Sequence, residues 1–498
     1  MKSKTFWLAT SALAAAVVWA VPLDAGAKER KPTLEERVKA LEEQQQQTQE
    51  QQADQRTRIT NIEQNAADTV WKFSNGRPTV TSGDKRFSLS LRGRFHFDFA
   101  SFMQDDNLPP AVTARDLSSG AVVRRAQIGV EGKAFKDFWY EMRFNFGGSD
   151  TETAAEAVNI MRVAYNPDPD FRINVGVMQP VFTYADAVSS NEITFMERAT
   201  IINTLVDPFG GSDGRRGVEL TYQHSGLLTS SDNIVITTAF TGQRTGSARA
   251  GDEGTQWLGR IAYRLWSDGA SNVQIGATGA TILNLQSVGP AASTVVQFRD
   301  RPEIRVDGTR LVDTGTSLGS MAADGGWMYG FEAGANFDNF YVGGEYYQFG
   351  LERDHFFAPA PGDPEFDGWY VEGSWILTGE PKSYSPKSSS NQYGVWGNPK
   401  VVTPFSLDGN SWGAWEIAVR YSTIDLNWNE GLAGFATPAG GVRGGEEEIW
   451  TFGVNWYLNN QIRVMFNFLD IDVDRLNGAG VQIGQELQVV GSRVQFAF

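Results

Sequence analysis

From residue 87 to its last residue, the chain alternates apolar and polar side chains with a period of two. In the first such segment the apolar series is Phe87, Leu89, Leu91, Phe95, Phe97 and Phe99, and the polar series is Ser88, Ser90, Arg92, Arg94, His96 and Asp98. Successive side chains of a β-strand point to opposite faces of its sheet, so a strand of this kind has one apolar and one charged face. The pattern therefore predicts β-strands throughout this part of the chain.

The alternation returns many times, with aromatic residues at the ends of the segments. Clear examples lie at 138–146, 257–265, 415–422, 450–458, 462–468 and 493–498. A soluble β-sandwich alternates too. Repetition over the whole region, with aromatic residues at strand ends, is instead typical of a transmembrane barrel whose apolar face contacts lipid. The terminal Phe498 on an amphipathic last strand is typical of bacterial outer-membrane barrels. We therefore expect an outer-membrane location.

Tight turns and longer connections alternate along the predicted strands. Turn-forming residues stand near 136–137, 167–170, 267–269, 338–339 and 459–460, and longer segments at about 100–120, 181–214, 286–325, 350–365 and 427–447. Short turns at one end of a barrel and long loops at the other produce this rhythm, and two termini at the same end require an even number of strands.

The expected fold is thus all-β, a transmembrane antiparallel β-barrel over residues 87–498. The predicted strands begin near 87, 121, 138, 156, 171, 216, 233, 256, 271, 326, 339, 366, 412, 448, 461 and 485. About sixteen strands is the porin size, which leaves an aqueous channel. This count places the long segment 379–411 at the end of the short turns. It either folds into the pore or contains a further hairpin.

The first 27 residues have the pattern of a signal peptide. Lys2 and Lys4 precede an apolar run from Phe6 to Val21, and Ala25-Gly26-Ala27 is a small-residue cleavage site. The alternative is an anchored N-terminal helix, but the run is short for a membrane span. No later stretch approaches the roughly 20 apolar residues that a spanning helix needs.

Residues 28–70 are predicted to form a periplasmic coiled-coil segment, followed by a linker at 71–86. A heptad seam with apolar ends and a polar middle runs through Leu34, Val38, Leu41, Gln45, Thr48, Gln52, Gln55, Ile59, Ile62 and Ala66. Thr33 and Glu36 form a capping box at the start of the helix. A solvated single helix or a disordered polar linker is the alternative. A coiled coil would join copies of the chain, and its helix could also tether the barrel to peptidoglycan.

Composition argues against several other functions. The chain has no Cys and a formal charge of −16, so we expect neither disulfides nor nucleic acid as a partner. The three histidines, His96, His224 and His355, lie in no nucleophile or metal-binding motif. We expect no enzyme activity, no cofactor and no metal. The partners expected are membrane lipids and the solutes of a channel.

Nine stretches resemble the phosphate-selective porins, the O and P family of outer-membrane channels. They are LRGR at 91–94, RRAQIGVEG at 124–132, ITFMER at 193–198, RPEIR at 301–305, LVDTG at 311–315, LTGE at 377–380, GAWE at 413–416, NWY at 455–457 and RVQFAF at 493–498. The resemblance implies a homotrimer of sixteen-stranded barrels that passes anions such as phosphate. It also implies that segments 181–214, 286–325 and 379–411 fold inward and line the pore.

Basic side chains on the polar face are the candidate pore-lining residues, because rings of Arg or Lys attract anions in a confined lumen. The strands supply Arg92, Arg94, Arg125, Lys133, Arg143, Arg172, Arg260, Arg264, Arg420, Arg463 and Arg493, and the second inward segment supplies Arg299, Arg301, Arg305 and Arg310. The alternative is that these cations pair with lumen carboxylates such as Glu131, Glu141, Glu219, Glu372 and Glu416, which would stiffen the wall.

The chain departs from the family where a Lys is often found, shortly after the strand that ends here at Val177. This chain has Met178-Gln179-Pro180 instead, and the segment 286–325 has no Lys. Arginines of that segment would then have to supply the anion site. A general or sugar-type porin is the alternative. Sugar channels line their constriction with aromatic residues, for which Tyr184, Phe195 and Phe209 are candidates, although packing of the inward segment is the simpler role.

Overall fold

A computed structural model of the chain describes ten stretches of residues. They are 33–67, 69–74, 76–104, 115–148, 157–212, 214–246, 251–286, 294–359, 361–386 and 393–498. The chain divides into two compact units, residues 1–64 and residues 65–498, and each is described by itself. The predicted signal peptide at 1–27 lies outside the described residues.

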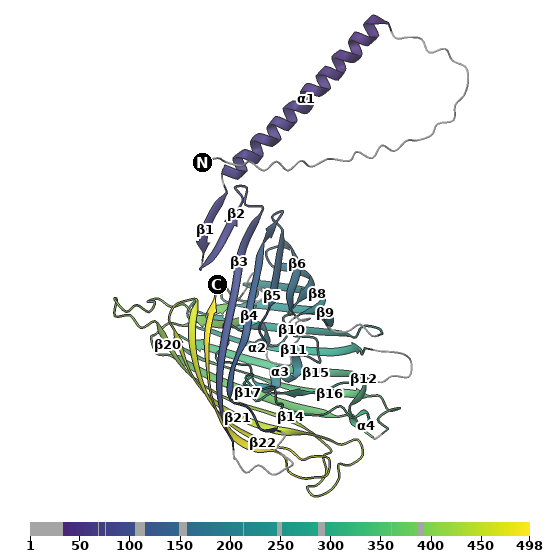
Figure 1. Cartoon of the computed structure of the whole chain (residues 1–498), viewed down its shortest axis with the longest axis vertical. Helices are drawn as coiled ribbons and strands as arrows, with labels where there is room; N and C mark the ends of the chain where they lie inside the picture. Colours follow the sequence, from purple (N-terminus) through teal and green to yellow (C-terminus); the bar gives the residue numbers. More distant parts are fainter. Residues whose placement is uncertain are drawn as a thin grey trace, which may run out of the picture. The chain divides into compact units, whose positions relative to one another are not determined.

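The second unit is built on one nineteen-stranded antiparallel sheet (Figure 1). Without β1, β2 and β12, which extend it, a ring of sixteen strands remains. They are β3 (Ser88–Gln104), β4 (Gly120–Ala134), β5 (Phe138–Asn145), β6 (Val158–Asp168), β7 (Phe171–Met178), β8 (Arg215–Ser225), β9 (Asn233–Arg244), β10 (Thr255–Ser267), β11 (Asn272–Asn284), β15 (Ala322–Phe337), β16 (Phe340–Arg353), β17 (Glu365–Ile376), β20 (Ala414–Trp428), β21 (Val442–Tyr457), β22 (Ile462–Asp474) and β23 (Gln485–Ala497).

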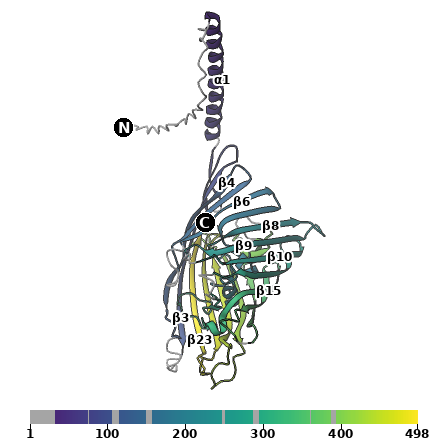
Figure 2. The same cartoon turned by 90° about the vertical axis from the view of Figure 1, so that its right-hand side faces the viewer.

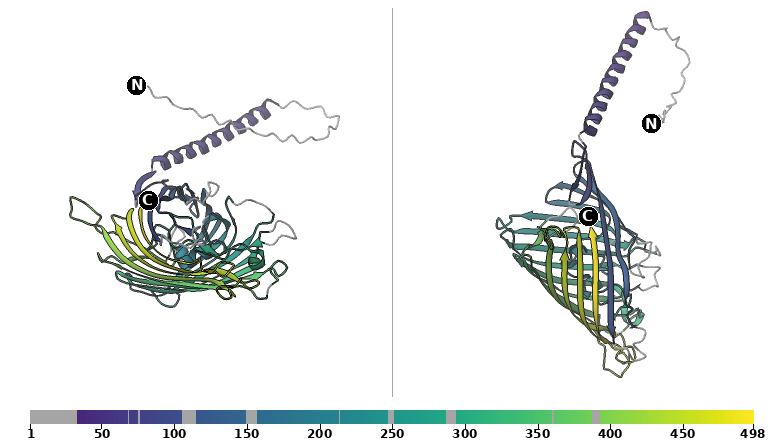
Figure 3. Two further views of the ribbon diagram at one scale, coloured as in Figure 1. Left: turned by 60° about the horizontal axis from the view of Figure 1, so that its bottom comes forward. Right: turned by 60° about the vertical axis from the view of Figure 1, so that its left-hand side comes forward.

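Each of these strands pairs with the next in sequence, and β23 pairs with β3 to close the barrel (Figure 2). The last strands, β20 to β23, lie side by side next to β3 (Figure 3). The prediction of about sixteen strands is confirmed. The predicted starts lie within a few residues of the observed ones, the widest difference being at β21, which begins at Val442 instead of near 448.

The two ends of the barrel differ in their connections. At the end that holds Phe498, which we call the turn end, residues 338–339 alone connect β15 to β16, and Asp338 takes a left-handed φ of 48° that Asp tolerates. The opposite end, which we call the loop end, carries the longer connections, apart from the segment 377–413 at the turn end. On the outer face, aromatic rings of neighbouring strands stack in pairs such as Trp415 with Trp456. Such aromatic bands mark the interfaces of membrane barrels.

Three segments turn into the lumen. The segment 179–214 enters from the loop end and contains α2 (Tyr184–Ala187) and α3 (Thr200–Val206) (Figure 1). The segment 285–321 enters from the same end and contains β12 (Thr294–Val295), β13 (Arg299–Asp300), β14 (Val312–Asp313) and α4 (Leu318–Met321). The segment 377–413 enters from the turn end and contains a separate hairpin of β18 (Lys382–Ser385) and β19 (Val395–Pro399). The segment therefore folds into the lumen, and the hairpin that it contains adds no strand to the barrel.

The inward segments form the apolar core. Ile201, Leu205 and Phe209 pack with Phe298 and with lumen-facing Phe349 in one cluster. A second cluster joins Tyr184 of the first segment to Trp396 of β19. An apolar interior is unusual for a barrel whose strands turn polar residues inward. It exists because these segments bring apolar side chains of their own, which pack against apolar lumen-facing residues of the wall strands.

The region before the barrel forms a helix and a hairpin. The helix α1 (Leu34–Ala67) covers the predicted heptad segment, and its apolar seam residues Leu41 and Ile62 are exposed. The hairpin of β1 (Val70–Ser74) and β2 (Arg77–Thr81) joins the sheet, where β2 pairs with the start of β3. No helix among the described residues is long and apolar enough to cross a membrane.

Candidate functional site

Three cavities of the lumen lie along one part of the wall, near β3 to β6. A cavity of about 860 Å³ lies toward the loop end, and we call it the vestibule. Its lining contains eight arginines against four carboxylates. The arginines are Arg124, Arg125, Arg198, Arg244, Arg299, Arg301, Arg305 and Arg310, and the carboxylates are Asp186, Glu197, Asp207 and Asp300. The vestibule therefore has an excess of positive charge.

Two smaller cavities continue from the vestibule toward the turn end. A space of about 90 Å³ shares Gln179 and Asp186 with the vestibule. A space of about 370 Å³ shares Arg92, Arg94 and Arg143 with that middle space and reaches Phe498 at the turn end. We call this series of three cavities the arginine path. Together the three cavities extend from the loop-end part of the lumen to Phe498 at the turn end.

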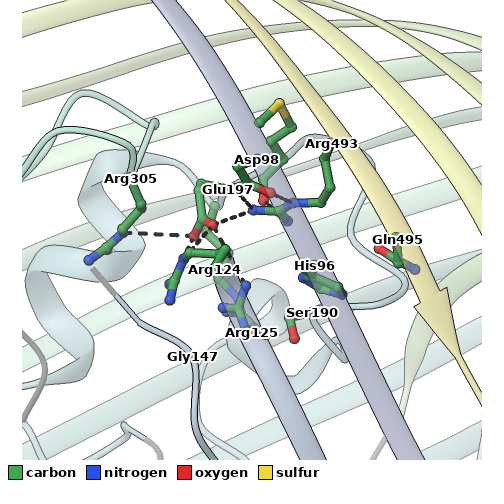
Figure 4. Close-up of polar contacts among 12 residues, drawn as sticks. His96, Asp98, Arg124, Arg125, Gly147, Ser190, Glu197, Arg305, Arg493 and Gln495 are labelled. Carbon is green, nitrogen blue, oxygen red and sulfur yellow. Dashed lines mark hydrogen bonds and ion pairs between the residues drawn. The ribbon is translucent and has the colours of Figure 1, made fainter. Parts of the chain in front are cut away.

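One carboxylate stands at the centre of the arginine cluster on the vestibule wall (Figure 4). Glu197 accepts hydrogen bonds from Arg124 at 2.9 Å and from Arg493 at 2.7 Å. Arg125 and Arg305 lie 3.6 Å and 3.7 Å from its oxygens. Glu197 belongs to the inward segment 179–214, so these contacts fix that segment to the wall.

A bulge in β4 directs two consecutive arginines into the lumen. Arg125 pairs with His96 of β3, and Val123 pairs with Phe97, so Arg124 is the extra residue. A bulge lets two neighbouring side chains of one strand share a face. Strict alternation would direct Arg124 into lipid, where a charge is costly. Two arginines in succession within an otherwise alternating strand were the signal for this bulge.

Glu303 has a similar anchoring role for the second inward segment. It has a left-handed φ of 56° and accepts hydrogen bonds from Ser422 at 2.6 Å and from Arg420. Its neighbour Ile304 is buried in the core. This arrangement leaves Arg301 and Arg305, on either side, to line the vestibule. The RPEIR motif therefore combines an anchor with two cavity-facing cations.

Burial and neighbouring charges shift the pKa values of titratable groups in the loops of the vestibule. Burial alone raises the pKa of the Glu197 carboxyl, but the four guanidiniums lower it well below its usual 4.5. Burial and the neighbouring Arg305 and Arg310 lower the pKa of Arg301 to about 10. Burial and Arg299 lower the pKa of Arg310. Both arginines keep their charge at neutral pH, in positions where that charge is only partly compensated.

The predicted basic residues fall into three groups. Those on the arginine path are Arg92, Arg94, Arg125, Arg143, Arg299, Arg301, Arg305, Arg310 and Arg463. Those away from it that pack against other lumen groups are Arg172, Arg260, Arg420 and Arg493. Arg264 lines a separate turn-end cavity, and Lys133 is exposed near the turn at 135–137.

Several of these cations form ion pairs with wall carboxylates, which is the alternative to a purely pore-lining role. Arg92 bonds Glu131 at 2.8 Å and Glu141 at 3.0 Å, and Arg143 also bonds Glu141. Arg260 forms two 2.7 Å bonds to Glu332. Glu219 also accepts a hydrogen bond from the backbone N–H of Val181 and so holds an inward segment. Wall carboxylates therefore compensate part of the positive charge in the turn-end half of the path, as Glu197 and Asp300 do in the vestibule.

The sequence did not identify six basic residues of the path. They are Arg77, Arg124, Arg162, Arg198, Arg244 and Lys400. Arg198 lies next to Glu197, but its direction depends on how the inward segment folds. It bonds the backbone carbonyls of Ala185 and Val188. No periodic pattern exists in such a segment, so only the structure places this side chain.

Gln179 occupies the junction of the vestibule with the middle cavity, where the family often has a nearby Lys. It donates a hydrogen bond to Asp186 at 2.8 Å. The three aromatic residues considered for a sugar site are all buried in packing, with Phe195 and Phe209 fully inaccessible. This position therefore contributes amide and carboxylate groups, and no aromatic surface.

Comparison with known proteins gives consistent results. A family model described as phosphate-selective porin O and P matches residues 89–498. Porin O of Pseudomonas aeruginosa is 25% identical over 464 residues, 88% of this chain and 94% of that protein. An uncharacterized protein of Caulobacter vibrioides is 25% identical over 408 residues, 80% and 71% of the two chains. A solved anion-selective porin from Comamonas acidovorans has a TM-score of 0.46 and 12% identity, and the likeness covers 83% of this chain and 100% of that one.

Proposed function

This chain belongs to the phosphate-selective porin O and P family and is an outer-membrane porin, and we propose that its channel passes small oxyanions such as phosphate by passive diffusion. Family and fold indicate a channel rather than an enzyme. The finer assignment concerns the solute and the residues that select it.

The observation that carries the proposal is the arginine path. Eight arginines and four carboxylates line its vestibule, within a lumen partly filled by protein. A confined passage with low-dielectric walls strengthens the attraction of anions and the repulsion of cations. Arginine also binds planar oxyanions through two parallel hydrogen bonds. The vestibule would therefore concentrate anions at the loop end.

Different arginines would have different roles along the path. Arg310 makes no ion pair or hydrogen bond to any described residue, and Arg299 is 4.0 Å from Asp313 with a partly exposed side chain. These two are suited to capture an entering anion. Arg94 donates to the hydroxyls of Ser189 and Ser190 at 2.9 Å and 2.6 Å, beyond the Gln179 junction. Arg94 is suited to receive the anion on the turn-end side of this junction.

Single-channel recording tests this proposal. The reversal potential in a KCl gradient gives the ratio of anion to cation permeability, and phosphate is then titrated into the KCl solution. We expect anion selectivity and a fall of KCl conductance as phosphate occupies the path. Cation selectivity, or conductance that phosphate leaves unchanged, would favour a general porin instead.

A homotrimer with a periplasmic N-terminus is the second part of the proposal. The exposed seam of α1 supports it, because Leu41 and Ile62 are apolar and uncovered in the single chain. Three such helices could cover these residues in a coiled coil. The 34 residues of α1 would extend about 50 Å at 1.5 Å per residue. That length also suits a spacer or a tether to peptidoglycan.

Deletion of residues 28–70 separates these roles. If residues 28–70 are not a tether, the deletion variant keeps its conductance, and the attachment of the outer membrane to the cell wall is unchanged. Loss of cell-wall attachment with normal conductance would support the tether. Conversion of trimers to monomers in native electrophoresis would support the coiled coil as an assembly element.

A further inference from the structure

The arrangement around Glu197 has more cations than one carboxylate needs. Its Oε1 lies 2.9 Å from Arg124 Nε, 2.7 Å from Arg493 Nη2 and 3.6 Å from Arg125 Nη1. Its Oε2 lies 3.4 Å from Arg124 Nη2 and 3.7 Å from Arg305 Nε. A single arginine can satisfy a carboxylate through two parallel bonds. Here guanidiniums from β4, β23 and the segment 285–321 converge on one group (Figure 4).

Two of these arginines also pair with other carboxylates, but all four still surround Glu197. Asp98 engages Arg493 at 2.6 Å, and Asp300 engages Arg305 at 3.0 Å. Arg125 has no such second partner. Its guanidinium makes no hydrogen bond to any described residue, its Nη1 is buried, and its side chain is only 9% exposed. A buried donor without a hydrogen bond lacks a favourable interaction that a better-placed oxygen would supply.

We propose that these four arginines form an oxyanion site and that Glu197 is its built-in occupant. The chain would thus fill its strongest anion site with its own carboxylate. This inference rests on the proposed function, because it concerns how firmly the channel holds the anions that it passes. Conduction requires binding that is favourable enough for entry and weak enough for release. An empty site of four arginines would hold phosphate too firmly, and Glu197 prevents this.

The site can be reached by a solute. Glu197, Arg124, Arg125 and Arg305 all line the vestibule, although the glutamate itself is only 3% exposed. Removal of its carboxylate would therefore open the site toward the water-filled side of the lumen. An anion that enters would replace the bonds that the protein loses.

Replacement by alanine gives the direct test. For Glu197→Ala we expect phosphate to reduce the KCl conductance at a concentration at least about tenfold lower than for the unmodified chain, because charge-assisted hydrogen bonds are regained. Glu332→Ala is the matched control. Glu332 is 4% exposed, bonds Arg260 and lines no cavity of the path. Its replacement leaves a single arginine, and we expect the phosphate dependence to stay unchanged.

Folding of the alanine variant is tested separately. We expect refolding of Glu197→Ala in detergent to improve when phosphate or acetate is added, and refolding of Glu332→Ala to be insensitive to both anions. Glu197→Gln keeps the shape and removes the charge. It should raise the ratio of anion to cation permeability above that of the unmodified chain.

The proposal is overturned if Glu197→Ala folds and shows the phosphate dependence of the unmodified chain. It is also overturned if the variant fails to fold, neither anion rescues it, and Glu197→Gln leaves the permeability ratio unchanged. Failure of the proposed function is a different result. A cation-selective unmodified chain would refute oxyanion uptake, whereas a gain of phosphate sensitivity in Glu197→Ala relative to that chain would still identify the site.

Discussion

Arg493 and Asp98 face each other across the line at which the barrel closes. They are register partners on β23 and β3, and the guanidinium donates to the two carboxylate oxygens at 2.7 Å and 2.6 Å. Both side chains are fully buried in the lumen. The same arginine reaches Glu197, so one side chain joins the first strand, the last strand and an inward segment.

Replacement of Arg493 by methionine should therefore destabilise the barrel strongly. Loss of one partner leaves buried carboxylates without compensation, which costs about 3–5 kcal/mol. Urea unfolding in detergent, followed by the heat-sensitive mobility of the folded barrel in electrophoresis, measures the change. Arg86→Met, at an exposed turn, is the control. Equal unfolding midpoints for the two variants would show that the closure does not depend on this ion pair.

Arg310 should influence selectivity more than stability. Its charge in the vestibule is only partly compensated. Removal of a unit charge about 4 Å from the passing anion changes the anion's energy by about 1 kcal/mol at the dielectric constant of water. For Arg310→Ala we expect the anion-to-cation permeability ratio to fall roughly two- to fivefold. Lys133→Ala, which removes an exposed cation outside the path, should leave the ratio unchanged. Equal effects of both would mean that overall charge, and not the vestibule, sets the selectivity.

Gln179 offers a test of the missing family lysine. Gln179→Lys alone should have a small effect, because the new ammonium would pair with Asp186, which the glutamine now contacts. Gln179→Lys combined with Asp186→Asn should make phosphate reduce KCl conductance at a clearly lower concentration. Titration of both variants in single-channel recordings decides this. Identical behaviour of the single and double variants would contradict a role for Asp186 at the junction.

The low pKa of Glu197 predicts a stability that depends on pH in acid. Because folding lowers this pKa below the usual 4.5, the carboxylate contributes stability fully above about pH 4.5. That contribution is lost as the pH falls through the lower value in the folded barrel. We expect the difference in urea midpoint between the unmodified chain and Glu197→Gln to be constant between about pH 5 and 8 and to shrink below about pH 4.5. Glu197→Gln should decline less steeply on the acid side, and an equal slope would exclude Glu197 as a contributor.

The hairpin β18–β19 should reduce the conductance of the barrel without setting its selectivity. Trp396 packs against Tyr184 and Tyr341 and donates to Asn336 at 2.7 Å, so the hairpin fills part of the lumen. Replacing residues 382–399 with a short Gly-Ser linker should raise single-channel conductance. The anion-to-cation ratio should change much less, since the vestibule arginines remain. An unchanged conductance would mean that the hairpin does not narrow the route that ions take through the lumen.

Sequence periodicity determined the barrel, the number of its strands and the positions at which they begin. A strand's alternation is local, and a shift of one residue would turn its whole apolar face into the lumen. Sequence therefore specifies register strongly. The strand count also placed the segment 379–411 at the end of the short turns, which is the end from which its hairpin enters the lumen.

The tertiary structure alone decided which cations line the path. Arg125 and Arg260 have the same period-two signature, yet Arg125 lines the vestibule while carbonyls of Tyr393 and Gly394 cover Arg260. The convergence of Arg124, Arg305 and Arg493 on Glu197 joins residues far apart in the chain. Alternation reports only the face of a strand on which a side chain lies. What covers that face depends on inward segments without periodicity, and these are placed by packing and long-range charge pairs.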